Sequence, residues 1–329
     1  MSLVAGTSGP EPLLLLSAAL VLDAVLPGAV WPFRFIPHPV RWIGRLADAL
    51  ESRFNRSNWS AATRRVSGAV LASVLSAGTV GFAAVVGSIG RGVPYGWLIE
   101  LALVTSLFAQ RSLFVHVSRV AEPLAMGDLG RARLAVAEIV GRDPDNLDRH
   151  AIARAAIESL AENFSDGVLA PVLWYACFGL PGLLVYKTIN TLDSMWGHRS
   201  ERFAAFGFAA ARLDDGLNLV PARLSGALLA LAALFVPKAQ PVEAWRSMWR
   251  DARKHRSVNA GWPESAVAGA LDLALAGPRR YGETLVDDSW MGGGRREAEP
   301  ADIARALGLY VAACVLVGLG VLGAAWLMA

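Results

Sequence analysis

The chain has 329 residues, of which 54% are hydrophobic and 18% are charged, and its formal net charge is +3. Soluble proteins carry about 25% charged residues, so this composition argues against an ordinary water-soluble enzyme. Disorder is excluded, because disordered chains combine low hydrophobicity with high net charge. The small net charge does not indicate nucleic-acid binding. The two cysteines, Cys177 and Cys314, lie inside apolar runs and argue against a disulfide framework or a cysteine zinc site.

Six apolar segments follow one another along the chain, and a helix needs about 20 apolar residues to cross a bilayer. They are residues 13–30, 66–89, 97–118, 168–186, 219–236 and 306–328. Prolines interrupt the fourth segment, at Pro171 and Pro181, and the uncharged part of the fifth, 224–236, has the length of a buried or re-entrant segment. The sequence therefore predicts an all-α, polytopic membrane protein with four to six membrane segments, in a single membrane-embedded domain over 1–329.

Basic residues orient the predicted segments. The loops 31–65, 119–167 and 237–303 are rich in Lys and Arg, which places them in the cytoplasm by the positive-inside rule. These loops are long enough to form helices of their own, including one from Leu147 to Phe164. Residues 241–257 have the pattern of a basic amphipathic helix. It either lies at the anionic inner leaflet, which is the simpler interpretation, or binds substrate.

Two short motifs place polar residues next to proline. In the first, Pro37 and Pro39 fix the backbone on both sides of His38. This motif predicts either an oriented imidazole with an anion-binding Arg41, or only a membrane boundary with an interfacial tryptophan. In the second, 259–264, Pro263 is expected at the first position of a helix that ends at Gly277-Pro278. Glu264 then complements the helix dipole.

A third motif, AIESLAENFSDG, carries Glu158, Glu162, Asn163 and Asp166. The two glutamates are four residues apart, so they lie on one face of a helix, which we expect to end at Gly167. Like charges at this spacing repel, and a bound Mg²⁺ would reverse the sign, because this ion takes one or two carboxylates plus substrate phosphates. A solvated face, with Arg154 paired to Glu158, explains the same pattern equally well.

Two further motifs put charged groups beside the fourth and fifth apolar segments. Lys187, Asn190 and Asp193 recur every three residues and share a helix face, with His198 following. Ionisable groups in such a place usually mark a functional site, although internal neutralisation of Lys187 by Asp193 is an alternative. The other motif, AARLDDGLNLVPAR, sets the adjacent carboxylates of Asp214 and Asp215 between arginines. It suits metal-phosphate chemistry and a salt-bridged helix end equally.

Six sequence motifs, taken in chain order, resemble those of one family. They are PHPVRWIG at 37–44, GRDPDNLD at 141–148, ARAAIESLAENFSDGVLAPVLWY at 153–175, GLPGLLVYKTINTLDSMWGH at 179–198, FGFAAARLDDGLNLVPARL at 206–224 and NAGWPESAVAGAL at 259–271. From about residue 20 to 285 the chain resembles the membrane adenosylcobinamide-phosphate synthases of cobalamin biosynthesis, the CobD/CbiB family. It departs from the family pattern after Asp23, where LPGAVWPF follows, and at 277–283, which reads GPRRYGE.

The resemblance implies an ATP-dependent, amide-forming ligase. A carboxylate of adenosylcobyric acid is joined to (R)-1-amino-2-propanol O-phosphate, or to aminopropanol, which gives adenosylcobinamide phosphate. ATP and Mg²⁺ are implied, and we expect an acyl-phosphate intermediate. No lysine follows a glycine, so a Walker A motif is absent and the nucleotide must be held in another way. We expect the active site on the cytoplasmic side of a bacterial inner membrane, and therefore expect 168–186 and 219–236 to dip or pack without fully crossing.

The resemblance indicates which positions to consider, and their chemistry suggests roles. We expect catalytic roles for Glu158, Glu162, Lys187 and Asp193. We expect substrate binding by His38, Arg41, Asn163, Asn190, His198, Arg212, Asn218, Asn259, Trp262 and Glu264. The expected Mg²⁺ ligands are Glu158, Glu162, Asp166, Asp214 and Asp215.

Two other functional classes remain open. Intramembrane charges and broken helices also suit a transporter. A non-catalytic membrane scaffold for enzymes of the corrinoid pathway is the other alternative, and it would not need the acidic cluster of the third motif. The expected partners are the two substrates, the lipid bilayer and other membrane proteins of the same pathway.

Overall fold

The computed structural model describes residues 10–26, 38–140, 145, 147–198, 200–281, 284–286 and 288–328. Five helical segments within it are long and apolar enough to cross a membrane by length and composition: Ala61–Gly92, Trp97–Ala125, Arg149–Trp196, Phe208–Phe235 and Pro300–Met328. A shorter apolar helix, α1 (Pro12–Val25), covers the first part of the predicted segment 13–30, whose last residues lie outside the described ones. The predicted all-α, multi-pass membrane fold is confirmed.

The chain divides into two compact units. Unit 1 comprises Met1–Ala109, Ala170–Asn218 and Val321–Ala329, and unit 2 comprises Gln110–Leu169 and Leu219–Gly320. The predicted membrane segment 97–118 is therefore split between α5 (Trp97–Leu107) and α6 (Gln110–Ala125). This division does not test the expectation of a single membrane-embedded domain, which stays a prediction.

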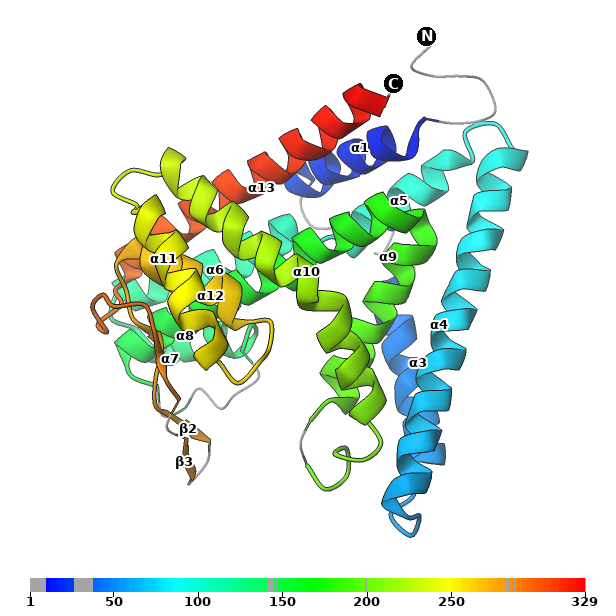
Figure 1. The fold of residues 1–329 in the computed structure, drawn as a ribbon, viewed down its shortest axis with the longest axis horizontal. Coiled ribbons are helices and arrows are strands. Elements are labelled where there is room, and N and C mark those ends of the chain that lie inside the picture. Colours follow the sequence, from blue (N-terminus) through cyan, green and yellow to red (C-terminus); the bar gives the residue numbers. More distant parts are fainter. Residues whose placement is uncertain are drawn as a thin grey trace. The chain divides into compact units, whose positions relative to one another are not determined.

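Unit 1 contains α1, α3 (Pro39–Phe54), α4 (Ala61–Gly92), α5, α9 (Ala170–Trp196) and the first part of α10 (Phe208–Ala232). Helices α3 and α4 pack against α9 and against each other (Figure 1). Their shared core consists of Ala47, Leu71, Ala72, Leu75, Ile189, Leu192, Trp196, Phe206 and Ala210. The side chain of Ser60 caps α4 by accepting a hydrogen bond from the Thr63 N–H.

Close backbone approaches position the segment between α9 and α10. A Cβ atom on Gly68 of α4 would collide with the carbonyl oxygen of Phe206. One on Gly207 would collide with the carbonyl oxygen of Trp196. Only glycine fits at these two contacts, so the ends of α9 and α10 are held together at a fixed spacing.

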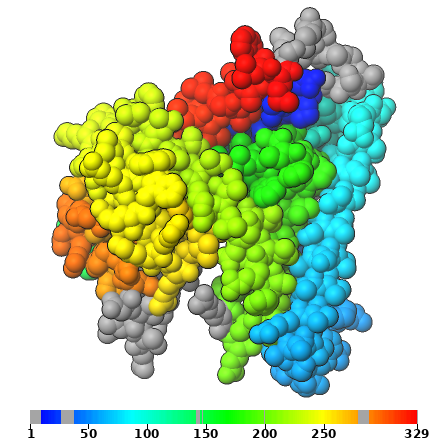
Figure 2. Space-filling model, viewed as in Figure 1, coloured from blue at the N-terminus to red at the C-terminus, as the bar shows by residue number. Residues whose placement is uncertain are grey.

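Unit 2 is built from helices with a small β region. It contains α6, α7 (Leu129–Ala137), α8 (Arg149–Phe164), the end of α10 with η3 (Ala233–Phe235), α11 (Pro241–Asp251), η4 (Ala252–Lys254), α12 (Gly261–Leu271) and most of α13 (Pro300–Met328). Helices α11 and α12 pack on each other, and their side chains are drawn in yellow in Figure 2. Strand β1 (Leu275–Ala276) pairs antiparallel with β4 (Trp290–Met291), and β2 (Arg279–Tyr281) with β3 (Thr284–Val286).

Two expected helix ends are wrong. The helix does not stop at Gly167, because α8 continues through a π-helical turn, η2 (Ser165–Leu169), into α9. Helix α12 begins at Gly261 and ends at Leu271, so Pro263 is its third residue rather than its first, and Asp272 in the left-handed conformation closes it before Gly277. The predicted interruption of 168–186 is present, since Gly179 adopts φ 63° and ψ −154° just before Pro181.

Candidate functional site

The centre of the unit 1 candidate site is the carboxylate of Asp214 on α10. Its Oδ1 accepts a hydrogen bond from Asn190 Nδ2 of α9 at 3.2 Å, and its Oδ2 accepts one from Asn218 Nδ2 at 2.9 Å. The hydroxyl of Tyr186 on α9 donates to Asn218 Oδ1 at 3.0 Å. Asp214 is 9% exposed and Asn218 only 1%. The two apolar helices therefore bury a connected polar cluster, which we call the Asp214 cluster (Tyr186, Asn190, Asp214 and Asn218).

Lys187 brings a positive charge to this cluster. It lies on α9 between Tyr186 and Asn190, and its ammonium group interacts electrostatically with the carboxylate of Asp214. The same ammonium acts on the imidazole of His38. Asn190, which was predicted to share a helix face with Lys187 and Asp193, is directed at α10.

His38 is held as a neutral imidazole. Its Nδ1 accepts a hydrogen bond from the N–H of Val40 at 3.3 Å, which caps α3, so its Nε2 carries the proton and donates to the carbonyl oxygen of Ser106 at 2.7 Å. Burial lowers the pKa of His38, and the charges of Lys187 and Arg41 lower it further, against the opposing effect of the Ser106 hydrogen bond. Both ring nitrogens are thus engaged, which is the geometry of an oriented imidazole, one of the two alternatives that the sequence left open.

The remaining predicted residues of unit 1 lie at its surface or at helix ends. Arg212 forms an ion pair with Asp215 at 3.1 Å, whereas the adjacent Asp214 binds Asn218 one turn further along α10. His198 is exposed, with its ring 6.2 Å from that of Phe203.

The carboxylate of Asp193 is enclosed by the end of α9. The main-chain carbonyl oxygen of Asp193 accepts a hydrogen bond from the N–H of Gly197 at 2.6 Å. A Cβ atom on Gly197 would collide with the Asp193 carboxylate. The glycine therefore lets the chain turn closely around this half-buried acid.

Several residues of unit 1 escaped the sequence interpretation. One is Tyr186. It lies four residues before Asn190, and this spacing, which puts both residues on one helix face, was the available signal. The hydroxyl of Tyr175 donates to Glu100 Oε1 at 2.8 Å, a contact across 75 residues that no local pattern indicates. Arg202 binds the carboxylate of buried Glu51 through two hydrogen bonds, of 2.9 and 2.5 Å. This Arg202 interaction lowers the pKa of Glu51.

The predicted acidic residues of unit 2 lie along α8 and η2. Glu158 is 6% exposed, and its Oε1 accepts the N–H of Ala276 at 2.7 Å. Glu162 is exposed, and Asp166 is half-buried in the π-helical turn. Asn163 donates to the carbonyl oxygen of Ser159 at 2.9 Å. Glu158 therefore differs from Glu162 in environment, although the two are one turn apart.

Arg154, the neighbouring cation, donates to the carbonyl oxygen of Arg296 and lies over the ring of Trp290, 5.5 Å from its centroid. Glu158 accepts its hydrogen bond of 2.7 Å from a backbone amide of β1. The alternative pairing of Arg154 with Glu158 stays a prediction. A π-helical turn often marks a functional position in a helix, and here it sets Asp166 beside this acidic stretch.

The start of α12 carries the last group of predicted residues. Glu264 lies 3.7 Å from the Nε2 of His255 and is 3% exposed. Trp262 donates from its indole N–H to the carbonyl oxygen of Val258, and the guanidinium of Arg223 lies 4.5 Å above its ring. Asn259, also buried, precedes this helix. Asn259, Trp262 and Glu264 thus all lie at the start of α12 in unit 2.

The predicted Mg²⁺ ligands were compared with what this ion requires. Among the described residues, no three His, Cys, Asp or Glu side chains form a group that could hold a metal ion. Mg²⁺ needs only one or two protein carboxylates when substrate phosphates complete its shell. Glu162 and Asp166 offer oxygen donors of the required kind one helical turn apart. They fit an ion that arrives with a phosphate.

Comparison with known proteins identifies the family. A family model described as "CobD/Cbib protein" matches residues 16–310 of this chain. This chain belongs to the CobD/Cbib family. Relatives named "Cobalamin biosynthesis protein CobD" include one from Rhodobacter capsulatus, 48% identical over 85% of this chain and 88% of that protein. Another, from Sinorhizobium sp, is 46% identical over 92% of this chain and 95% of that protein. No solved structure matches.

The family and the names of these relatives assign the chain to cobalamin biosynthesis. The motifs that first suggested this family lie within the matched region. Parts of two of them, Pro37 and residues 141–144 and 146, lie outside the described residues. The same holds for LPGAVWPF beyond Leu26, and the side chains of 279–283 are not described.

Proposed function

We propose that the protein joins a carboxylate of adenosylcobyric acid to (R)-1-amino-2-propanol O-phosphate in an ATP-dependent amide-bond formation. Family membership supports the pathway. The observation that carries the chemical part is the buried, hydrogen-bonded Asp214 cluster between apolar helices. Buried, connected polar groups at membrane depth are costly and mark functional sites.

A carboxylate does not react with an amine at neutral pH unless it is activated. In the proposed first step, a carboxylate oxygen of the corrinoid attacks the γ-phosphorus of ATP, ADP leaves, and an acyl phosphate forms. In the second, the amine nitrogen attacks the acyl carbon, inorganic phosphate leaves, and the nitrogen loses a proton to a base. Both steps concentrate negative charge, so cations positioned before the reaction lower the barrier.

The residues of unit 1 suit the anionic and amide groups of such substrates. We assign Lys187, Arg41 and Arg212 to substrate phosphate or carboxylate, because lysine and arginine side chains are the cations that bind such anions. We assign Asn190 and Asn218 to the carboxamide groups of the corrinoid, since an amide side chain both donates and accepts. Asp193 is the proposed base for the amine proton.

The acidic residues of unit 2 suit the metal. Glu162 and Asp166 would hold Mg²⁺ together with the phosphates of ATP, and the ion would neutralise charge on the transferring phosphoryl group. Glu158, whose carboxylate is fixed by Ala276, would orient this pair. We place the site on the cytoplasmic side of the inner membrane, where ATP is available.

The test uses purified protein in detergent with adenosylcobyric acid, aminopropanol phosphate and Mg-ATP, and mass spectrometry of the corrinoid product. Glu162→Ala and Asp193→Ala should abolish product while the protein stays folded. The exposed Arg131 on α7 pairs with Asp128 and has no assigned role, so Arg131→Ala is the control. Product at the wild-type rate from both acidic variants would remove these residues from the site. No product from folded wild-type protein would overturn the reaction.

A transporter is the second candidate, favoured by the break in α9 at Gly179 within an apolar helix. Broken helices with polar groups at membrane depth are typical of transport sites. Proteoliposomes distinguish the two. A ligase gives a new corrinoid mass that depends on ATP, whereas a transporter gives unchanged labelled corrinoid inside the vesicle.

A further inference from the structure

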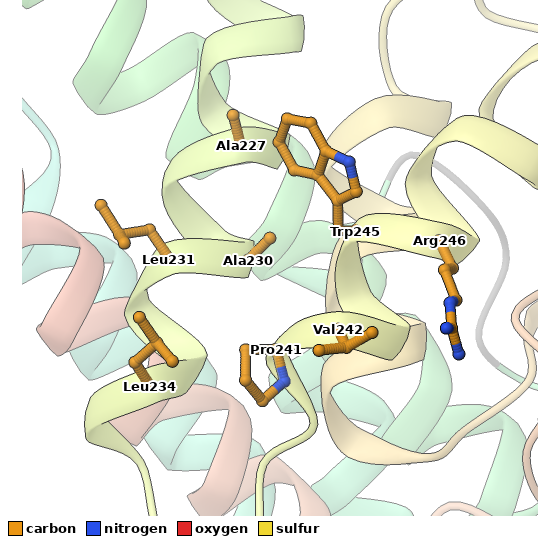
Figure 3. A pocket seen from close by; sticks show the side chains of 8 residues that line it. All are labelled: Ala227, Ala230, Leu231, Leu234, Pro241, Val242, Trp245 and Arg246. Atoms are coloured by element: carbon orange, nitrogen blue, oxygen red, sulfur yellow. The ribbon is translucent and has the colours of Figure 1, made fainter.

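An apolar groove of about 410 Å³ lies between the end of α10 and the start of α11, within unit 2. Helix α10 contributes Ala227, Ala230 and Leu231, the following η3 contributes Leu234, and α11 contributes Pro241, Val242, Trp245 and Arg246. Figure 3 shows Ala227, Leu231 and Leu234 on one side of the space and Pro241, Val242 and Trp245 on the other, with Arg246 farther from the α10 residues and extending away from them. Seven of these eight residues have no charged group.

The periodicity of both helices explains the groove. The three α10 residues and Leu234 of η3 follow the spacing of one helical face, and the two alanines on it leave the depth that a larger side chain would fill. Helix α11 uses another face, with Ala244, Ser247 and Met248, for its buried contacts. Its apolar residues Val242 and Trp245 are therefore left over, 60% and 48% exposed.

The groove opens where an apolar helix ends. The candidate membrane span of α10 continues to Phe235, and Leu234 and Phe235 are 62% and 66% exposed. Such a continuous apolar surface is unfavourable in water. Tryptophan and arginine beside it are the residues that gather at the boundary between hydrocarbon and headgroups.

Charge identifies the occupant. Residues 238–256 contain six Lys or Arg and two Asp or Glu. Arg246 lines the groove and forms a long ion pair with Glu243, at 4.0 Å, but its side chain is 71% exposed, so most of its guanidinium is open to an anion in solvent. A molecule with an apolar tail and an anionic head therefore matches both the apolar walls and this arginine.

We propose that this groove binds one anionic phospholipid, with an acyl chain between α10 and α11 and its phosphate on Arg246. An apolar chain fits the apolar walls, and the guanidinium binds a phosphate through charge-assisted hydrogen bonds. The bound lipid covers the exposed faces of both helices and fixes α11 at the membrane surface.

Native mass spectrometry of the detergent-purified protein tests the proposal, with phosphatidylglycerol and phosphatidylcholine added at equal concentration. The wild-type protein should retain phosphatidylglycerol at least fivefold more than phosphatidylcholine. Ala227→Phe fills the groove and should lose bound lipid of both kinds. Arg246→Gln should keep the acyl-chain site but lose the preference for phosphatidylglycerol.

Arg131→Gln is the matched control, because it removes the same charge from the same unit at a residue that does not line the groove. It should bind lipid as the wild type does. Thermal denaturation shows whether Ala227→Phe is folded, and the exposed Arg246→Gln gives an independent answer if it is not. Unchanged lipid preference in Arg246→Gln, or the same loss in Arg131→Gln, would overturn the proposal. So would a lipid-free dimer that Ala227→Phe converts to monomer, because a second copy would then occupy the groove.

Discussion

The side-chain amide of Asn190 donates a hydrogen bond of 3.2 Å to the carboxylate of Asp214, and so joins α9 to α10 inside unit 1. The second oxygen of that carboxylate accepts from Asn218, which lies one turn further along α10. Two amides thus fix both oxygens of one buried acid. Rotation of this carboxylate would break both hydrogen bonds and leave two amide donors without their acceptor.

This arrangement predicts a large difference between two adjacent acids. Asp214→Ala leaves the buried amide of Asn218 without its acceptor, which costs about 1–3 kcal/mol of unfolding free energy. Asp215→Ala removes a surface pair with Arg212, and such pairs are worth at most about 1 kcal/mol. Denaturation in detergent measures both. Equal losses in the two variants would mean that the Asp214 cluster contributes no more than a surface ion pair.

Close packing at Gly68 gives the second prediction. Gly68→Ala should destabilise unit 1, because the new methyl group meets the carbonyl of Phe206. On the same helix, Gly78 has no atom within 4 Å of an added Cβ. Gly78→Ala should therefore stabilise by about 1 kcal/mol through helix propensity alone. Thermal denaturation of the two variants should show shifts of opposite sign, and a shared sign would contradict the close approach.

The electrostatics of His38 give the third. Since the charge of Lys187 lowers the pKa of His38, Lys187→Met should raise that pKa towards its usual value. NMR titration of ¹⁵N-labelled histidine measures it. Arg45→Met removes a charge that lies over Trp42 instead and should leave the titration unchanged. An unchanged His38 pKa in Lys187→Met would show that the charge of Lys187 does not act on this imidazole.

The fourth prediction concerns pH and Asp251. Burial opposes ionisation of this acid, but hydrogen bonds from Arg250, Lys254 and the N–H of Gly292 outweigh it and lower its pKa to about 2. The usual value is 3.8. An acid whose pKa is lower in the folded than in the unfolded state stabilises the folded state at pH values above its unfolded pKa. This contribution is lost as the pH falls through its folded pKa.

Asp251→Asn should therefore be less stable than the wild type at pH 6. The difference should shrink as the pH falls from about 4 to about 2, and melting temperatures across this range measure it. The exposed Asp128 on α7 offers a comparison, because Asp128→Asn should show a small difference throughout. If Asp251→Asn lowers the melting temperature by the same amount at every pH, its effect comes from packing and not from the ionisation of Asp251.

The sequence predicted the helical architecture because membrane segments leave a direct compositional signal. The polar motifs at His38, Lys187 and Asp214 were also visible, since charged groups stand out beside apolar runs. Their partners were less accessible. Glu51 binds Arg202 across 151 residues, and Glu158 binds the backbone of Ala276 across 118. No local periodicity encodes such contacts.

Spacing alone allowed two geometries at some positions. Asn218 lies three residues from Asp215 and four from Asp214, and both spacings fit one helix face. Burial decides between them, because the face that carries Asp214 turns inward. At Gly167, the glycine suggested a helix end, whereas a π-helical turn lets the helix continue.

The most direct test of the central claim follows one oxygen atom. Adenosylcobyric acid labelled with ¹⁸O in its reacting carboxylate is incubated with purified protein, aminopropanol phosphate and Mg-ATP. If ATP activates this carboxylate as an acyl phosphate, one ¹⁸O per product molecule should appear in inorganic phosphate, as measured by mass spectrometry. Amide product accompanied by unlabelled phosphate, or formed without ATP, would contradict the account.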